Sequence, residues 1–399
     1  MKHVGILGGG QLGTMLAEAL FHLDAPVTIY DADPTAPAIE RFADTIVSPW
    51  SDLEAIEKFA RRCEIVTYEF EHIDAAPLRA LSSGPPIVPS IEVLEITQDR
   101  AREKQFLARH ELPHVHFVVV RSEEELRGEA RRFSWPFILK TIRGGYDGKG
   151  QFYIAGHEDL DAAIVALRER KNFDLVLEEV VDLKLEVSCI VARVASASST
   201  AAQEVVFPLF ENAHAGHILD LTVVPARVPP DVARLVQDIA LRTARAIDLH
   251  GLLTIEFFVG RSPARRSRAE EASGLYVYVN ELAPRPHNSG HVTRNACTFS
   301  QYDALARVLA GVPLTAPQMN GDGAWCMANL LGDVWLAQGN EKLDLSCWSE
   351  HPAVVDVVLY GKKAARARRK MGHFVTHAAT PEEATVAARA FREALAKGK

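Results

Sequence analysis

Short apolar runs alternate with helical patterns through the first quarter of the chain. The first predicted helix, after residue 10, carries Met15, Leu16 and Leu20 on its apolar side. The alternation predicts an open α/β layer, so residues 1–95 are expected to form a Rossmann-like N-terminal domain. Strands are predicted at 4–7, 26–31, 44–47 and 65–68, and further helices at 52–62 and around 75–81.

From residue 97 the pattern becomes mixed. We expect residues 96–182 to form a second domain and residues 183–399 to form a third region of α+β type. The second domain is predicted to have a capped helix start at 97–100, helices at 123–133 and 160–168, and strands at 117–120, 136–140, 152–154 and 175–181. The third region is predicted to have helices at 230–247, 300–310 and 381–397, and strands at 184–191, 253–259, 275–281, 325–331, 353–360 and 371–375.

Two strands of the third region flank a charged stretch at 261–273, which has no apolar periodicity and is predicted to be a disordered hairpin loop. Pairing the strands about the centre of this loop puts Glu256 opposite Glu281. Two facing carboxylates in apolar strands repel each other unless a cation lies between them, and oxygen ligands favour Mg²⁺. A polar sheet face is the alternative, which the apolar neighbours disfavour.

A glycine-rich stretch, 143–151, joins two predicted strands and reads RGGYDGKGQ. Its four glycines let the backbone approach an anion, and Lys140 and Lys149 add positive charge. The stretch is not a P-loop, because Gly150 stands after the lysine where that motif needs Ser or Thr. A flexible surface hairpin is the alternative, but the lysines and the later carboxylates favour a nucleotide.

A second glycine pattern lies near the N-terminus. Gly8, Gly10 and Gly13 follow the first strand and Asp31 ends the second, as in the dinucleotide-binding fingerprint. The helix start at Gln11 and Leu12 suits a single phosphate equally well.

Three further polar stretches are candidates for a site. Residues 68–71 follow a strand, where ligand-facing residues collect, although an acidic helix start explains them equally well. The proline-braced turn at 282–291 presents polar side chains on a non-periodic loop. The basic run at 362–370 suits a solvated loop, a nucleic-acid patch or a small-phosphate pocket, and its confinement to one loop of an acidic protein favours the last.

The composition is that of an ordinary globular protein, with 399 residues, 48% hydrophobic and 24% charged. The net charge of −8 disfavours nonspecific nucleic-acid binding. Five scattered cysteines without metal spacing favour a reducing cytosol over a secreted disulfide framework. With neither a signal peptide nor a bilayer-length apolar stretch, the chain is expected to be cytoplasmic and to have no membrane or nucleic-acid partner.

Five motifs, at 8–13, 68–73, 145–151, 280–291 and 369–373, follow one another in the order found in one ATP-grasp family. The chain resembles the N5-carboxyaminoimidazole ribonucleotide synthases of purine biosynthesis over nearly its whole length. The resemblance implies a mixed α/β and α+β fold. It consists of a pre-ATP-grasp domain, an ATP-grasp lid domain, and an ATP-grasp large domain with a small C-terminal α+β region.

The resemblance also implies carboxylation of 5-aminoimidazole ribonucleotide (AIR) by bicarbonate and ATP through carboxyphosphate, with Mg²⁺, by a homodimer. It implies that the ATP site comprises Arg100, Lys140, Gly145, Gly148, Lys149, Gly150, Gln151, Glu178, Glu179, Val180, Val181, Glu186 and His214, and that Glu256 and Glu281 hold the metal. The implied catalytic residues are Tyr146, Asp147, Arg285, His287, Asn288 and Lys370. The implied AIR-binding residues are Gln11, Leu12, Glu69, Asn288, Lys362, Arg369 and Lys370.

One departure from the family pattern affects the basic run. Family members commonly have Arg-Pro-Gly-Arg-Lys, whereas this chain has Arg366-Ala367-Arg368-Arg369-Lys370. The turn is expected to be less constrained, and Arg366 and Arg368 are either phosphate contacts or exposed charges.

Three other functions compete with this assignment. A formate-dependent glycinamide ribonucleotide transformylase resembles the chain in fold, but its glycine loop has serines where Tyr146 and Asp147 stand. An NAD(P) oxidoreductase leaves the second glycine loop and the carboxylate pair unexplained. A nucleotide sensor or nucleic-acid-binding protein would use the basic run, and its binding to oligonucleotides would depend on salt.

Overall fold

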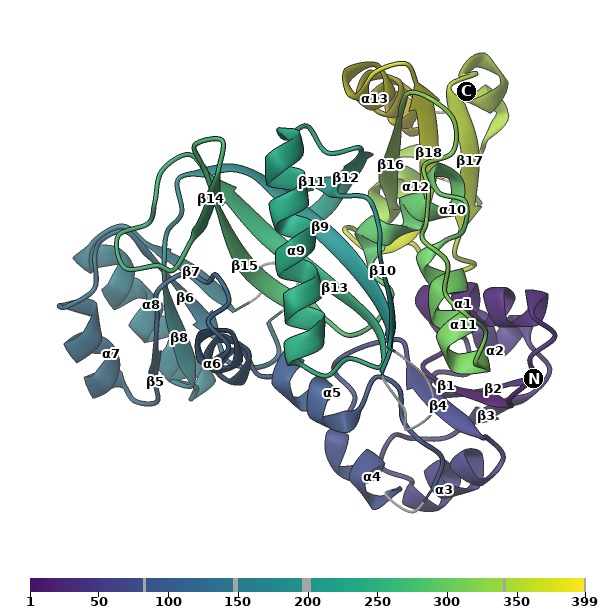
Figure 1. Ribbon diagram of the computed structural model, residues 1–399, viewed down its shortest axis with the longest axis horizontal. Coiled ribbons are helices and arrows are strands. Elements are labelled where there is room, and N and C mark those ends of the chain that lie inside the picture. The colour runs from purple at the N-terminus through teal and green to yellow at the C-terminus, as the bar shows by residue number, and fades with distance from the viewer. Residues whose placement is uncertain (82–83, 146–149, 196–201, 340–341, 398–399) are drawn as a thin grey trace.

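Three sheets organise the computed structural model (Figure 1). The structure describes residues 1–81, 84–145, 150–195, 202–339 and 342–397. In these ranges no helix is long and apolar enough to cross a membrane.

The N-terminal sheet has four parallel strands in the order β3-β2-β1-β4. Parallel strands end at one edge, so the polar segments after β1 and β4 lie side by side there. The α/β layer is thus confirmed. Its elements are β1 (Val4–Leu7), α1 (Gln11–His22), β2 (Val27–Asp31), α2 (Pro37–Arg41), β3 (Thr45–Val47), α3 (Leu53–Arg61), β4 (Ile65–Tyr68) and α4 (Ala75–Ala80).

The predicted capped helix start within 97–100 is confirmed, and a further helix precedes it. Thr97 is the last residue of an unpredicted helix, α5 (Ile91–Thr97), and the next helix is α6 (Arg100–Arg109). Asp99 caps α6, because its side chain accepts a hydrogen bond from the Arg102 N–H at 3.0 Å.

A small antiparallel sheet follows, with strand order β5-β8-β6-β7. The glycine hairpin is confirmed, because β6 and β7 pair and Lys140 lies opposite Gln151. The elements of this unit are β5 (Phe117–Val120), α7 (Glu123–Ala130), β6 (Phe137–Thr141), β7 (Gln151–Ile154), α8 (His157–Arg170) and β8 (Leu175–Glu179).

The remaining strands form one ten-stranded antiparallel sheet that includes the C-terminal region. β12 pairs with β16, and this ladder joins the strands β9–β15 to the C-terminal strands β16–β18 in one sheet. Its strands are β9 (Leu183–Val194), β10 (Gln203–Val206), β11 (Phe210–Ala215), β12 (Ile218–Val224), β13 (Gly251–Gly260), β14 (Glu270–Ala272), β15 (Leu275–Ala283), β16 (Ala324–Leu331), β17 (Val354–Leu359) and β18 (Lys370–Ala378).

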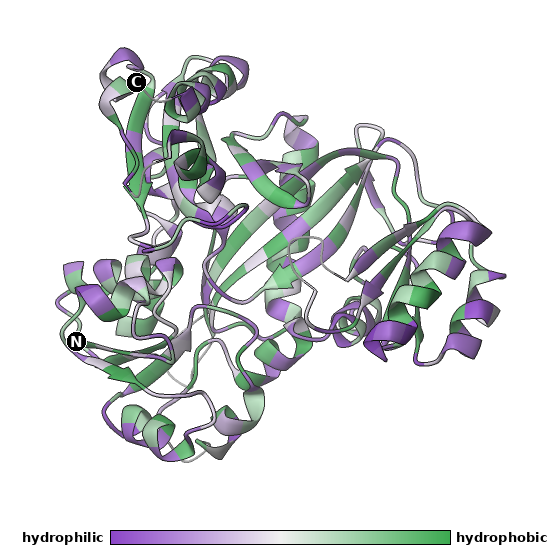
Figure 2. Ribbon diagram, turned by 180° about the vertical axis from the view of Figure 1, so that it is seen from behind, coloured by the Kyte–Doolittle hydropathy of each residue, from purple (hydrophilic) through white to green (hydrophobic). Residues whose placement is uncertain are grey.

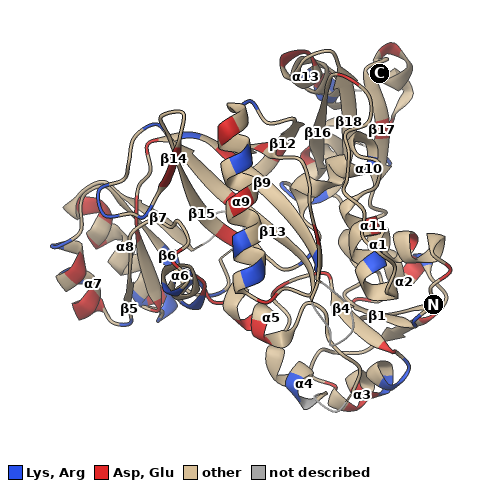
Figure 3. Cartoon of the chain, viewed as in Figure 1, with Lys and Arg blue, Asp and Glu red and all other residues tan. Residues whose placement is uncertain are grey.

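Helices cover the faces of this sheet. The apolar residues of α9, Val232, Val236 and Ile239, recur at helical spacing and are buried against it, while charged bands lie along the helix (Figure 3). Figure 2 shows the hydrophobic colour running along the strands of the large sheet. The helices are α9 (Pro230–Ala246), α10 (Thr293–Ala296), α11 (Gln301–Ala310), α12 (Gly332–Gln338) and α13 (Pro381–Lys397), with 3-10 turns η1 (Asn288–Val292) and η2 (Ser346–Glu350).

The predicted disorder of 261–273 is wrong. β14 pairs with β15, and Arg268, two residues before β14, pairs with His114, so both the large sheet and the segment that leads into β5 hold this stretch. Charge alone predicted disorder, whereas long-range hydrogen bonds fix this backbone.

Candidate functional site

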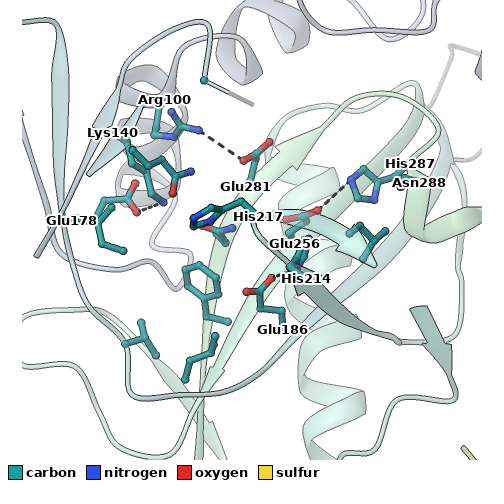
Figure 4. Close-up of a pocket in the computed structure, with 18 of the residues that line it drawn as sticks. Arg100, Lys140, Glu178, Glu186, His214, His217, Glu256, Glu281, His287 and Asn288 are labelled. Carbon is teal, nitrogen blue, oxygen red and sulfur yellow. Dashed lines mark hydrogen bonds and ion pairs between the residues drawn. The ribbon is translucent and has the colours of Figure 1, made fainter. Parts of the chain in front are cut away.

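A cavity of about 440 Å³, the first cavity, lies between the small sheet and the large sheet. Its volume is typical of small-molecule sites. Lys140 and Glu178 reach it from the small sheet, and Glu256 and Glu281 reach it from the large sheet (Figure 4).

Three buried charges meet on its small-sheet side. Lys140 Nζ donates to Glu178 Oε2 at 2.6 Å, and Lys104 Nζ lies 3.6 Å from the other carboxylate oxygen. Burial opposes the charge of Glu178, but the two ammonium groups outweigh it and lower its pKa to about 2. Burial also lowers the pKa of Lys140. Two cations against one carboxylate leave a positive charge for a phosphate.

Sequence reasoning missed Lys104. Ala101 and Leu107, three residues before and after it, are buried on the same side of α6. A lysine on the apolar side of a helix was the signal that could have identified it.

Glu178 and Glu179, two of the residues implied for the ATP site, lie within the small sheet. β8 lies between β5 and β6, and both residues are paired within the sheet. The backbone beyond the paired strand begins at Val180 and Val181, which line the first cavity.

The glycine loop borders the first cavity through Gly145 and Gln151. Gly150 has φ +74°, and a Cβ on it would lie 2.4 Å from Thr141 Oγ1, so only glycine fits. Tyr146, Asp147, Gly148 and Lys149 lie outside the described residues, and their roles stay predictions.

Two more predicted nucleotide residues form a pair on the large sheet. Glu186 Oε2 lies 2.7 Å from His214 Nδ1. Burial lowers the pKa of His214, but the Glu186 hydrogen bond and charge outweigh it, so the net shift is upward. His217, in the same hairpin turn, also lines the cavity and was not predicted.

The Glu256–Glu281 pairing is confirmed, and each carboxylate lies beside a basic side chain of the protein. His287 Nε2 lies 3.1 Å from Glu256, and Arg100 lies 3.8 Å from Glu281. Burial opposes the charge of Glu256, but His287 outweighs it and keeps this pKa low. Burial and the Glu256 charge raise the pKa of Glu281.

The donor set of this carboxylate pair fits Mg²⁺, which proteins commonly hold through one or two carboxylates together with substrate phosphates. Among the described residues, no group of three or more His, Cys, Asp or Glu side chains could hold a metal by itself. A metal at Glu256 and Glu281 therefore needs ligand oxygens to complete its coordination.

Arg285 is paired with Glu71, which lies in the candidate stretch 68–71 but had no predicted role of its own. Its guanidinium donates two hydrogen bonds to the Glu71 carboxylate and a third, at 3.0 Å, to the Pro286 carbonyl. Burial opposes the Glu71 charge, but Arg285 outweighs it and lowers the pKa of Glu71 to about 2. Glu71 therefore fixes the plane of the guanidinium.

The turn after β15 brings His287 and Asn288, like Arg285, to the wall of the first cavity. His287 Nδ1 lies 2.9 Å from Ser289 Oγ, which fixes its ring beside Glu256. Both amide atoms of Asn288 are buried and have no hydrogen-bond partner within the described ranges. A buried amide of this kind points to a bound ligand that would satisfy it.

A second cavity of about 350 Å³ lies against the N-terminal domain. Gln11, Leu12 and Glu69 line it, as predicted for one site. The two cavities share part of their lining. The shared residues are Glu71, Arg285, His287, Asn288 and Lys370.

The first glycine turn is occupied by carboxylates of the protein itself. Glu69 accepts hydrogen bonds from the N–H groups of Gly10 and Gly13, each at 2.5 Å, and Asp31 accepts one from Gly9 at 2.6 Å. The fingerprint therefore serves internal contacts, contrary to the dinucleotide interpretation. The start of α1, at Gln11 and Leu12, borders the cavity and is the part available to an anion.

The side chains of the basic run, 362–370, differ in their burial and in their hydrogen-bond partners. Lys362 Nζ donates to the Lys370 carbonyl at 2.8 Å, and burial and Arg369 lower its pKa to about 8. Arg369 donates to the Ala364 carbonyl at 2.7 Å. Arg368 is exposed, has φ +66° and donates to the Gly216 carbonyl at 2.6 Å. Arg368 therefore contacts the hairpin turn beside the first cavity.

Known families match successive parts of the chain. Residues 1–98 match the ribonucleotide synthetase preATP-grasp domain, 105–302 the ATP-grasp domain, and 326–386 the phosphoribosylaminoimidazole carboxylase C-terminal domain. These matches confirm the expected fold class.

Individual relatives agree. The N5-carboxyaminoimidazole ribonucleotide synthase of Bacillus subtilis is 34% identical over 383 residues, which cover 95% of this chain and 92% of that protein. That of Staphylococcus aureus is 32% identical over 376 residues, covering 93% and 91%.

Solved structures of this type are also similar. An ADP complex of N5-carboxyaminoimidazole ribonucleotide synthetase has a TM-score of 0.86 at 33% identity, covering 98% of this chain and 96% of that one. The Aspergillus clavatus enzyme with ADP and AIR has a TM-score of 0.83 at 26% identity, covering 99% and 98%. The chain belongs to the N5-carboxyaminoimidazole ribonucleotide synthases, the ATP-dependent ligases of purine biosynthesis within the ATP-grasp superfamily.

Proposed function

We propose that the chain uses ATP and bicarbonate to carboxylate the N5 amine of AIR, with ATP in the first cavity and AIR in the second. The observation that carries this is the wall shared by the two cavities, with Arg285, His287 and Asn288 in it. A carboxyl group activated on one side of this wall has a short path to an amine on the other.

The reaction transfers one phosphoryl group and forms one C–N bond. A bicarbonate oxygen attacks the γ-phosphorus of ATP, giving ADP and carboxyphosphate, which breaks down to phosphate and CO₂. The AIR amine then attacks CO₂ and loses a proton. Positioning and charge neutralisation dominate such chemistry.

On the ATP side, Lys140 and Arg100 bind phosphate oxygens, the backbone of Val180 and Val181 reads the purine, and Glu186 with His214 contacts the ribose. The remaining members of the proposed ATP site are Gly145, Gly148, Lys149, Gly150, Gln151, Glu178 and Glu179. The positive excess around Glu178 supports the phosphate position. Mg²⁺ held by Glu256 and Glu281 would neutralise phosphate charge, in keeping with the donor set.

On the AIR side, Gln11, Leu12, Glu69, Lys362, Arg369 and Lys370 bind the ribonucleotide. Asn288 supplies its buried amide to AIR, and Arg285 binds the bicarbonate-derived anion. His287, with Tyr146 and Asp147, positions or exchanges protons with bicarbonate and the amine. The unpartnered amide of Asn288 supports this placement.

Further expectations complete the proposal. The working unit is a cytosolic homodimer. Each chain is divided into a pre-ATP-grasp domain at 1–95, a lid domain at 96–182, and a large domain with the C-terminal region at 183–399.

ADP release by the purified protein with MgATP and bicarbonate tests this function. We expect strong stimulation by AIR that disappears when bicarbonate is removed. Formate with glycinamide ribonucleotide, run in parallel, is expected to give no stimulation. ADP release only with the formate pair would keep the ATP site and overturn the AIR assignment.

A further inference from the structure

The segment between β13 and β14 connects three parts of the molecule. We call residues 261–268 the strap. In Figure 1 it belongs to the green chain that extends from beside β14 toward the unit of β5–β8. The strap begins in the large sheet, yet most of its contacts are with the small unit and with the connection from β8 to β9.

The first turn of the strap holds that connection. The Arg261 N–H donates to the Asp182 carbonyl at 2.8 Å, and its guanidinium donates to the Asp182 side chain at 3.1 Å. Ser262 Oγ donates to the other Asp182 carboxylate oxygen at 3.2 Å. Asp182 directly follows Val181, so the strap is bonded to the backbone that lines the first cavity.

The far end of the strap holds the other side of the same backbone. Ser267 Oγ donates to Glu179 Oε2 at 2.7 Å, and the Arg266 N–H donates to the same oxygen at 3.1 Å. Glu179 is buried, so these bonds take the place of water. Val180 and Val181 thus lie between two residues, Glu179 and Asp182, that the strap fixes.

The strap is itself anchored on both units. The Ser267 hydroxyl accepts a hydrogen bond from the His116 N–H at 2.8 Å while it donates to Glu179. Arg268 and His114 exchange two backbone hydrogen bonds, at 2.8 and 3.0 Å. The Ala264 N–H donates to the hydroxyl of Tyr278, on β15, at 2.8 Å. Ser267 is therefore the point where the strap, Glu179 and the start of β5 meet.

We propose that the strap pre-organises the Glu179–Asp182 segment for purine recognition, with Ser267 as its positioning residue. A backbone segment held in its binding conformation before the ligand arrives loses less freedom on binding, and affinity rises accordingly. The Ser267 side chain acts on nucleotide affinity through Glu179 and does not touch the reacting atoms. This inference rests on the proposed placement of the purine at Val180 and Val181.

The test compares ligands with and without a purine. S267A is expected to weaken ADP binding about five- to tenfold, the effect of one lost hydrogen bond. Binding of inorganic triphosphate, which has no base, is expected to stay within twofold. Calorimetry on the full chain gives both affinities, and a kinetic comparison should show KM for ATP rising more than kcat falls.

The matched control is S273A, in the neighbouring turn. Ser273 Oγ donates to Asp231 at 2.5 Å, on α9 and away from Glu179, so S273A removes a similar bond without touching the purine segment. Its ADP affinity is expected to stay within twofold of the parent. Should S267A fold poorly, S267T and S267V provide an isosteric pair that differs by the hydroxyl, and only S267V should lose ADP affinity.

Two outcomes would overturn the inference. Unchanged ADP affinity in S267A would remove the positioning role. Equal losses for ADP and triphosphate would indicate general damage to the site. A failure of the proposed carboxylation is separate, because ADP binding requires neither AIR nor bicarbonate, and the difference between S267A and S273A can be measured without turnover.

Discussion

In the first cavity acidic and basic side chains pair with one another, whereas the wall that the two cavities share holds a buried amide without a hydrogen-bond partner among the described residues. Glu178 faces Lys140, Glu256 faces His287, and Glu186 faces His214. The Asn288 amide, by contrast, has no hydrogen-bond partner in the described part of the chain.

The difference shows two ways of preparing a site. In the proposed function, such pairs would hold the phosphate- and metal-binding groups in place before MgATP binds, so little reorganisation would be needed during the reaction. An unpartnered amide costs the free protein stability and gives a ligand that satisfies it a matching gain in affinity. Substitutions should therefore disturb catalysis most in the first cavity and AIR affinity most in the second.

The largest effect is expected from E256Q, which removes one charge of the carboxylate pair and keeps its shape. We expect kcat/KM for MgATP to fall about a hundredfold, because charge stabilisation at the phosphates is lost. The Mg²⁺ concentration needed for half-maximal rate should rise. An unchanged Mg²⁺ dependence would contradict the metal assignment.

The next largest effect is expected at Asn288, in the wall that both cavities share, and on the binding of AIR. N288A should raise KM for AIR about tenfold, because the ligand loses hydrogen bonds to a buried amide. KM for ATP should change less than threefold, and the melting temperature of the free protein should not fall, since that amide has no partner to lose. A larger effect on ATP than on AIR would reverse the assignment of the cavities.

A smaller effect is expected on the pH dependence of AIR binding. The pKa of Lys362 is lowered to about 8, so its positive charge is present below that pH and is lost above it. KM for AIR should rise about fivefold between pH 7 and pH 9, because Lys362, the proposed partner of the AIR phosphate, loses its positive charge. K362R, which stays charged, should flatten this rise. A rise that persists in K362R would assign it to another group.

The smallest effect concerns Arg368, which contacts the hairpin turn beside the first cavity. Arg368 has a left-handed backbone, which costs an ordinary residue about 1 kcal/mol that glycine avoids. R368A and R368G both lose the bond to Gly216, but only R368A keeps this strain, so R368A should be the less stable of the two by about that amount. Urea unfolding of the two variants measures the difference, and equal stability would mean that the backbone strain is absent.

Much of the fold was predictable because it depends on local periodicity. The α/β layer, the glycine hairpin and the final helix each follow from apolar residues that recur at short sequence spacing. The α5 helix was missed because α5 and α6 are separated by only Gln98 and Asp99, and the second start masked the first.

The site was predictable where a motif or a strand register defines it. The sequence by itself determined that Glu256 faces Glu281, because a hairpin with period-two side chains fixes which residues oppose each other. The family resemblance assigned Gln11, Leu12 and Glu69 to one site, and the structure brings them together because the parallel strands β1 and β4 end at the same edge.

Only the tertiary structure decided which charges pair across the chain. Glu71 and Arg285 are 214 residues apart, Lys104 and Glu178 meet from a helix and a strand, and Ser267 reaches Glu179 from the strap that follows β13. No local period connects such residues. Their pairing depends on how separate sheets pack, and burial then makes an unpaired charge too costly to keep.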